Sequence, residues 1–266
     1  MTRPITAWLA LSFVAVLYAL VYLPIALVVL TSLNESTITT LPIDDYSLKW
    51  FWLLFANTRT LSALWTSIQL GILSACAATA IGLLAALAVV RHEFPGRRAF
   101  LALLTLPMIA PGVVLGVSLL LAARVVGFKT GFPALFLGHT LLALPYCAFI
   151  IISSLARFDR SFEDAGRGLG ATELQVLRRV TLPSIAPGII GALLFGFTIS
   201  IGEFVVSFFL TSAGTTTLPI RIYSIVKVGI TPEINAVSTL ILVVTLAMAL
   251  FAVRLTWAEK NERRRK

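Results

Sequence analysis

Long stretches without charge constrain this chain more than any other feature. Residues 4–34 and 60–90 each form a run of 31 residues that holds no Asp, Glu, Lys or Arg. A helix needs about 20 apolar residues to cross the hydrocarbon core of a bilayer. Charged residues make up only 12% of the chain, which is about half the share of a soluble domain. The sequence therefore predicts an all-α membrane protein.

Six stretches have the length and composition of a spanning helix. The first is too long for a signal peptide and has no small-x-small cleavage site, so we expect it to remain as a membrane anchor. We expect one transmembrane domain over residues 1–266, with spans at about 7–33, 61–90, 99–123, 134–156, 188–212 and 235–255.

The distribution of basic residues predicts the orientation. If the six spans alternate, fifteen of the 21 Lys and Arg residues fall on one side of the membrane. Short cytoplasmic loops carry an excess of Lys and Arg. Both termini are therefore predicted to be cytoplasmic. The net charge of +9 follows from this excess, and the basic residues 263–266 are suited to lipid headgroups. We expect no nucleic-acid partner.

The predicted cytoplasmic loop at 157–187 contains the pattern of two short helices. In the first helix, Phe162, Ala165 and Leu169 recur at helical spacing and form a small apolar face. Glycine at 168 and 170 should end this helix. Either Asp159 or Ser161 is suited to cap its start.

The second helix of this loop has clearer boundaries. Thr172 and Gln175 have the spacing of a capping box, and Pro183 is expected to end the helix. Two helices this short are marginal by themselves in water. We therefore expect them to pack against the membrane bundle or against a cytoplasmic protein that accepts a helix.

The spacing of this loop resembles the EAA loop of permease subunits in bacterial binding-protein-dependent ABC importers. The family pattern is Glu-Ala-Ala, three residues, Gly, nine residues and Ile-x-Leu-Pro. Two positions differ, because Asp164 replaces Glu and Gly166 replaces Ala, although Glu163 offers a similar charge next to the pattern. The matching residues are Asp164, Ala165, Gly166, Gly170, Val180, Leu182 and Pro183.

This resemblance implies the type I permease fold of ABC importers in a bacterial inner membrane. It also implies that the loop couples the chain to a separate ATPase dimer. The coupling residues would be Glu163, Asp164, Ala165, Gly166, Gly170, Leu182 and Pro183.

Segments 204–209, 217–224 and 232–239 resemble the C-type permease subunit of spermidine/putrescine importers. The resemblance implies a polyamine substrate, a second permease subunit and a periplasmic solute-binding protein. Related importers of other small solutes share parts of these motifs, so another small solute stays open. An ion-coupled secondary transporter is a second alternative, although it would not need the two loop helices.

The sequence does not predict an enzyme or a metal site. No Gly-Lys dipeptide occurs, so the phosphate-binding loop of ATPases is absent. We expect no cofactor on this chain, with ATP bound by the partner subunit. Cys76 and Cys147 both lie in apolar runs, and we expect buried thiols without a disulfide or metal role.

Three residues within the predicted spans are candidates for the substrate pathway. Glu203 is an acid inside a span, which is a functional hypothesis by default; it either attracts the ammonium groups of a substrate or serves gating or packing. His139 either lines the pathway or forms a hydrogen bond between helices. Tyr146 either offers a ring face to a cation or packs beside Pro145.

Overall fold

The computed structural model describes residues 4–36, 43, 45–228 and 232–265. Within these residues the regular structure is helical, and the only strand-like pairings are the isolated bridges Asn34–Tyr46 and Ser212–Thr215. The chain divides into two compact units. The first comprises residues 1–61 with 222–244, and the second comprises residues 62–221 with 245–266.

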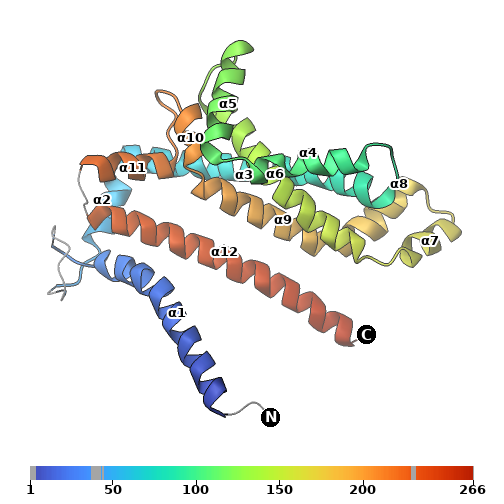
Figure 1. Ribbon diagram of the computed structural model, residues 1–266, viewed down its shortest axis with the longest axis horizontal. Coiled ribbons are helices and arrows are strands. Elements are labelled where there is room, and N and C mark those ends of the chain that lie inside the picture. Colours follow the sequence, from blue (N-terminus) through green and yellow to red (C-terminus); the bar gives the residue numbers. More distant parts are fainter. Residues whose placement is uncertain (1–3, 37–42, 44, 229–231, 266) are drawn as a thin grey trace. The chain divides into compact units, whose positions relative to one another are not determined.

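Figure 1 shows the helices in chain order. They are α1 (Pro4–Thr31), α2 (Lys49–Ala56), α3 (Thr58–Arg91), α4 (Arg97–Ile109), α5 (Gly112–Val125), α6 (Phe132–Ala156), α7 (Ser161–Gly168), α8 (Glu173–Val176), the π-helix η1 (Leu177–Thr181), α9 (Leu182–Gly202), α10 (Val205–Leu210), α11 (Leu218–Val228) and α12 (Pro232–Arg265).

Several of these helices are suited to a bilayer. Four stretches of described residues are long and apolar enough to cross it, namely Ala7–Thr31, α3, α6 and the helical run Glu173–Gly202. The bent pair of α4 and α5 adds a fifth if it counts as one span. The shorter apolar helix Pro232–Ala247 lies in α12 and overlaps the sixth predicted span. The chain is therefore a multi-pass membrane protein, and the count of six spans stays a prediction.

The third predicted span, 99–123, is not one continuous helix. It consists of α4 and α5, whose axes meet at 106°. Ala110 between them has an extended backbone, with φ −64° and ψ 132°. Pro111 explains this conformation, because the proline ring disfavours the helical region for the residue before it.

The fifth predicted span, 188–212, is also broken and begins earlier. Its helix α9 starts at Leu182 and ends at Gly202, and α10 follows from Val205. Glu203 between them has an extended backbone, with φ −75° and ψ 116°. Its side chain accepts a hydrogen bond from the backbone N–H of Val206 at 2.8 Å. This bond satisfies one of the N–H groups that the start of a helix leaves unpaired.

Pro183 does not end a helix, contrary to the sequence prediction. It lies in the first turn of α9, inside a helical run that continues from Glu173 to Gly202. The π-helix η1 immediately precedes α9. Within this run the Leu182 N–H bonds to the oxygen of Leu177, five residues back, which is the π-type pattern that interrupts the regular α-helical bonding just before the proline. The helix therefore passes through the proline.

Close contacts between helices hold the second unit together. One buried cluster joins α3, α6 and α9 through residues that include Ala78, Cys147 and Ile185, and Figure 1 shows α6 and α9 side by side. A Cβ atom on Gly82 would lie 2.9 Å from the backbone nitrogen of Ala148. Such close approach through small residues is typical of helix packing in membranes.

A second buried cluster of this unit joins α3, α6 and α10. It includes Leu70, Leu135 and Leu210, with leucines of α5 packed against it. Cys147 is buried as predicted, whereas Cys76 is exposed on α3, so the prediction of a buried thiol was wrong at that position. An apolar run in a membrane protein does not imply burial in protein, because lipid also accepts apolar side chains.

Three hydrogen bonds connect separate segments of the first unit. The indole Nε1 of Trp50 in α2 donates to the backbone oxygen of Asn34 at 2.7 Å. The Asn57 amide donates to Glu233 at 3.2 Å. Asn235 donates to the Thr31 hydroxyl at 3.0 Å. These bonds tie residues near the end of α1 and around α2 to the start of α12.

Candidate functional site

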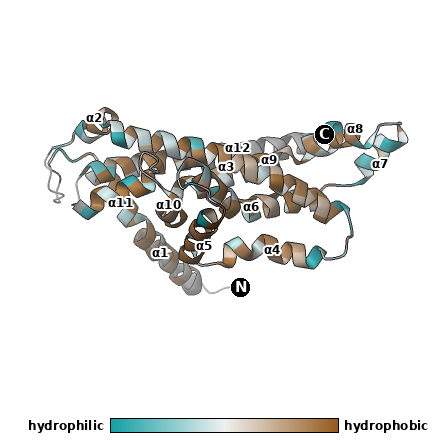
Figure 2. Cartoon of the chain, turned by 90° about the horizontal axis from the view of Figure 1, so that it is seen from above, coloured by the Kyte–Doolittle hydropathy of each residue, from teal (hydrophilic) through white to brown (hydrophobic). Residues whose placement is uncertain are grey.

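The loop between α6 and α9 has its own defined structure. Figure 2 shows hydrophilic residues gathered on α7, in contrast to the hydrophobic α5 and α6. The helix α7 ends in a Schellman motif. The N–H of Ala171 bonds to the oxygen of Gly166 at 3.1 Å, and the N–H of Gly170 bonds to the oxygen of Arg167 at 2.9 Å. Gly170 has φ +83°, which explains why the family pattern places glycine here.

The start of α7 differs from a capped helix. Asp159 accepts a hydrogen bond from the Ser161 backbone N–H at 2.9 Å, but the N-cap residue Arg160 makes no side-chain cap. The bond from Ser161 holds the pKa of the Asp159 carboxyl below its usual value. Asp159 therefore stays charged and shapes the turn that leads into α7.

The second helix of the loop begins as the sequence predicts. The Thr172 hydroxyl accepts from the Gln175 N–H at 3.4 Å. The Gln175 side chain accepts from the Thr172 N–H at 2.9 Å. Both bonds of the capping box are formed, so the prediction from the spacing of these two residues is confirmed.

Glu163 lies inside the protein rather than on the loop surface. Only 5% of the residue is exposed. Its Oε1 accepts a hydrogen bond from Arg91 Nη2 at 2.6 Å and another from the Thr181 hydroxyl at 2.6 Å. The carboxylate thus joins α7 to the last residue of α3 and to the last residue of η1. Because the Glu163 carboxylate is buried within this chain, its position does not suit the direct contact with the ATPase subunit that the resemblance implies.

The apolar side chains of the loop are exposed instead. Phe162 is 62% exposed, Leu169 is 90% exposed and Leu174 is 54% exposed. Ala165 is exposed as well. The apolar face formed by Phe162, Ala165 and Leu169 is therefore largely uncovered by the chain's own bundle, although the Phe162 ring lies 6.2 Å from the ring of Phe158.

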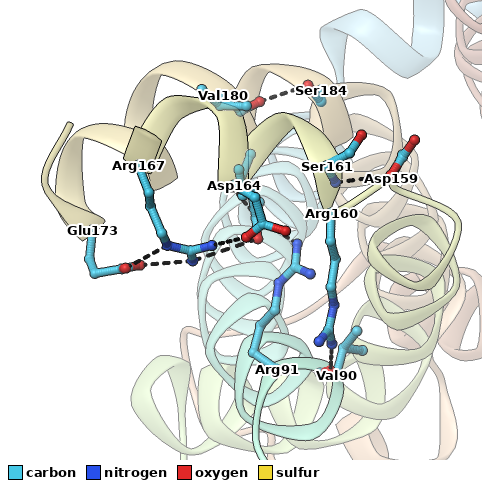
Figure 3. Close-up of polar contacts among 12 residues, drawn as sticks. Val90, Arg91, Asp159, Arg160, Ser161, Asp164, Arg167, Glu173, Val180 and Ser184 are labelled. Carbon is cyan, nitrogen blue, oxygen red and sulfur yellow. Dashed lines mark hydrogen bonds and ion pairs between the residues drawn. The ribbon is translucent and has the colours of Figure 1, made fainter. Parts of the chain in front are cut away.

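A charged cluster connects the two loop helices, as Figure 3 shows. Arg167 donates to Glu173 at 2.7 Å and to Asp164 at 2.8 Å. The bonds from Arg167 lower the pKa of the Glu173 carboxyl, and Glu173 in turn raises the pKa of Arg167. Arg167 and Glu173 are therefore both charged at neutral pH, and their ion pair is lost only when the carboxylate is protonated in acid. Because it is solvent-exposed, it adds little stability.

A cavity of about 600 Å³ lies beside these helices. It is bounded by the end of α3, by α7 and by the start of the helical run that continues into α9. Its lining includes Leu87, Arg91, Arg160, Glu163, Leu174 and Thr181. Of the predicted coupling residues, Glu163 and Asp164 line it, whereas the other five (Ala165, Gly166, Gly170, Leu182 and Pro183) do not. Pro183 lines a separate groove next to Phe158 and Phe162.

His139 forms a hydrogen-bonded connection between helices. It is 1% exposed. Its Nδ1 lies 2.7 Å from the Ser200 hydroxyl of α9, and its Nε2 lies 2.8 Å from the Ser207 hydroxyl of α10. Ser207 also donates to the backbone oxygen of Glu203 at 3.0 Å. Of the two roles considered for His139, the structure shows the interhelical bond.

The three pathway candidates therefore have different surroundings. The carboxylate of Glu203 caps α10, and Ser207 connects its backbone to His139. Tyr146 is half-buried, and its ring packs against Phe195 with 5.6 Å between centroids. Tyr146 thus packs against an aromatic ring of α9, and its role toward a cation stays a prediction. Among the residues that the structure describes, no three His, Cys, Asp or Glu side chains form a metal site.

The sequence alone does not identify the residues that form these contacts with Glu163 and His139. Arg91 and Thr181 hold Glu163, and Ser200 and Ser207 hold His139. Serines within apolar spans are a weak signal, since they often bond to their own helix. The partners come from positions that are 18 to 72 residues apart in sequence. No local pattern reveals such pairs.

The family of the chain follows from a comparison with known proteins. Residues 78–264 match the family described as the inner membrane component of binding-protein-dependent transport systems. The chain belongs to this family. The match covers the last part of α3, all of α6 and α9, and the whole coupling-loop region. The resemblance found in the loop therefore extends to most of the protein.

Two relatives with named transport functions align with most of this chain. It is 37% identical to the spermidine/putrescine transport system permease protein PotC of Haemophilus influenzae, over 92% of this chain and 95% of the relative. It is 36% identical to the putrescine transport system permease protein PotI of Escherichia coli, over 85% of this chain and 82% of the relative.

A solved structure shares the fold of this permease. It is a bacterial alginate ABC transporter in complex with an alginate pentasaccharide-bound periplasmic protein. The TM-score is 0.69 at 18% identity, and 92% of each chain is covered. At this identity the likeness shows the fold alone, which is that of an ABC importer permease.

Proposed function

We propose that this chain is a permease subunit of an ATP-driven importer that carries polyamines across a bacterial inner membrane. The observation that carries the proposal is the α7–α8 pair. It exposes Phe162, Leu169 and Leu174 next to the charged cluster of Asp164, Arg167 and Glu173. An apolar surface with a charged rim is suited to a protein partner.

The partner of this surface is an ATPase subunit in our proposal. The chain itself has no Gly-Lys dipeptide and therefore no phosphate-binding loop, so the energy comes from ATP bound by another subunit. We propose an ATPase dimer, a second permease subunit and a periplasmic solute-binding protein as the complete assembly. The family description supports this proposal, because it names binding-protein-dependent transport.

The membrane orientation belongs to the same proposal. Six spans with both termini in the cytoplasm place the α7–α8 pair on the cytoplasmic side, where ATP is available. The excess of Lys and Arg in the same segments supports this side. The broken helices α4–α5 and α9–α10 fit a transporter, since discontinuous helices are tolerated at membrane depth where they line a cavity.

The names of the relatives support putrescine or spermidine as the substrate. Both relatives are permease proteins for such polyamines. Polyamines carry several ammonium groups, which an acid in the pathway attracts. We propose that Glu203 is such an acid, because it lies at the break between α9 and α10 and is only half-buried. One of its oxygens caps α10.

Uptake of labelled putrescine and spermidine tests the proposed function. The chain, its partner permease, the ATPase and the binding protein would be reconstituted in vesicles that are loaded with ATP. We expect uptake that requires ATP, the binding protein and this chain. Uptake that persists without the ATPase would instead indicate an ion-coupled carrier. ATP-dependent uptake of a solute other than a polyamine would overturn the substrate assignment alone.

A further inference from the structure

The buried contact around Glu163 differs from what a docking residue requires. Arg91, Glu163 and Thr181, which we call the Glu163 clasp, come from the end of α3, from α7 and from the end of η1. The Glu163 side chain is 6% exposed and the Arg91 side chain 14%. Thr181 is 2% exposed. A partner subunit cannot reach the carboxylate while the clasp is closed.

Further contacts reinforce the same connection. Arg160, just before α7, donates to the backbone oxygen of Val90 at 2.5 Å, as Figure 3 shows. This bond satisfies one of the carbonyl groups that the last turn of α3 leaves unpaired. The Arg91 guanidinium lies 5.7 Å from the centre of the Phe158 ring. Four side chains thus hold α7 and the turn before it against the end of α3.

The clasp is a buried ion pair with one additional hydrogen bond. Burial lowers the pKa of Arg91, and Glu163 opposes that effect. Arginine nevertheless stays charged in proteins. Removing one partner from a buried ion pair leaves an uncompensated charge, which is strongly unfavourable. The three elements are therefore expected to move together. Arg167, whose Nη2 lies 4.0 Å from Glu163 Oε2, connects the clasp to the exposed carboxylates of Asp164 and Glu173.

We propose that Glu163 is a positioning residue that transmits movement of α7 to α3 and α9 and does not itself contact the ATPase. A force applied to the exposed face of α7 reaches α3 through Arg91 and reaches α9 through Thr181. Docking and transmission are thus divided between neighbouring residues, with Asp164 on the surface and Glu163 inside. This inference rests on the proposed function.

The ratio of imported substrate to hydrolysed ATP tests this role. The variant Glu163→Gln keeps the shape and an oxygen that accepts from Thr181, but it loses the charge that holds Arg91. In the reconstituted importer we expect assembly and ATP hydrolysis to persist, while import per ATP falls several-fold. Arg91→Gln should give a similar loss. The double variant should be no worse than either, because both changes break one contact.

The matched control is Asp159→Asn, which removes one negative charge from the same loop outside the clasp. Its amide oxygen still accepts from Ser161, so the ratio should stay unchanged. If Glu163→Gln fails to assemble, Thr181→Val makes the same test, since it removes one contact to Glu163 without a charge change.

Two outcomes would overturn the proposal. An unchanged ratio in the clasp variants would show that the clasp transmits nothing. A parallel loss of import and hydrolysis would place Glu163 at the docking surface. If the unmodified importer shows no ATP-dependent uptake at all, the proposed function fails rather than the clasp.

Discussion

His139 and Glu203 illustrate how polar residues are accommodated in an apolar helix bundle. Each has its hydrogen-bonding groups directed at a specific partner on another helix or at a helix end. His139 joins α6 to both sides of the break between α9 and α10. Glu203 sits at that break and caps α10. At the residue scale, these two polar side chains are therefore first structural connections, and any role toward substrate is added to that.

Replacing Glu203 in two ways separates its charge from its capping bond. Glu203→Gln keeps an oxygen that accepts from Val206, so we expect normal assembly and reduced polyamine uptake. Glu203→Ala removes the cap as well and should also lower stability by about 1 kcal/mol. Uptake and thermal unfolding in detergent measure the two effects. Normal uptake by Glu203→Gln would exclude a role that depends on charge.

His139→Leu should destabilise the protein without changing its helix content. The variant loses two interhelical hydrogen bonds, which together are worth about 1 to 2 kcal/mol in a membrane protein. Thermal unfolding in detergent measures the loss. The control is Thr140→Val, because the buried Thr140 hydroxyl has no hydrogen-bond partner in the described structure. If the control destabilised as much as His139→Leu, the bonds of His139 would not explain the effect.

Among the elements, the loop helices depend on their ends more than on their interiors. The helix α7 has only eight residues, whereas α8 is the first turn of the helical run from Glu173 to Gly202. Isolated helices this short do not form stably in water. The Schellman motif at Gly170, the capping box at Thr172 and the contacts of Glu163 supply what helix propensity does not.

Glycine substitutions distinguish the ends of α7 from its interior. Gly166→Ala restores the residue of the family pattern, and its Cβ would lie 3.4 Å from a Val176 methyl group, which is an ordinary contact. We expect stabilisation by up to about 1 kcal/mol. Gly170→Ala forces alanine into the left-handed region and should cost about 1 to 2 kcal/mol. Thermal unfolding of the full importer measures both, and equal effects would contradict the Schellman motif.

At the scale of the molecule, the second unit depends on close approach between α3, α6 and α9. The cluster of α3, α6 and α9 is built from small residues such as Ala78, Ala143 and Ala192. In lipid, packing of this kind replaces the hydrophobic effect as the driving force between helices. The same bundle supports the α7–α8 pair at one end and the break at Glu203 further along α9.

Gly82→Ala tests this packing. The new methyl group would meet the backbone of Ala148 at 2.9 Å, so α3 and α6 must move apart. We expect a loss of about 1 to 3 kcal/mol, seen as a lower unfolding temperature and lower yield of assembled importer. Gly202→Ala is the control, because nothing lies within 4 Å of its Cβ position. An unaffected Gly82→Ala variant would show that this contact is not tight.

The sequence by itself determined the class of the protein and the family of its loop. The length of the charge-free runs determines that their helices prefer the membrane. Local spacing determines that one helix ends near Gly170 and that the next begins after Thr172. These properties depend on neighbours in sequence, so they can be predicted. The sequence also led to the hypothesis of a permease, which the family match bears out.

Only the tertiary structure decided which side chains are buried together. Glu163 and Asp164 are adjacent carboxylates, yet one is inside and the other outside because α7 meets α3 and η1 along one face only. The break at Pro111 follows from the proline itself, whereas the break at Glu203 is connected through Ser207 to the distant His139. Burial depends on contacts between residues far apart in sequence, and local patterns do not contain that information.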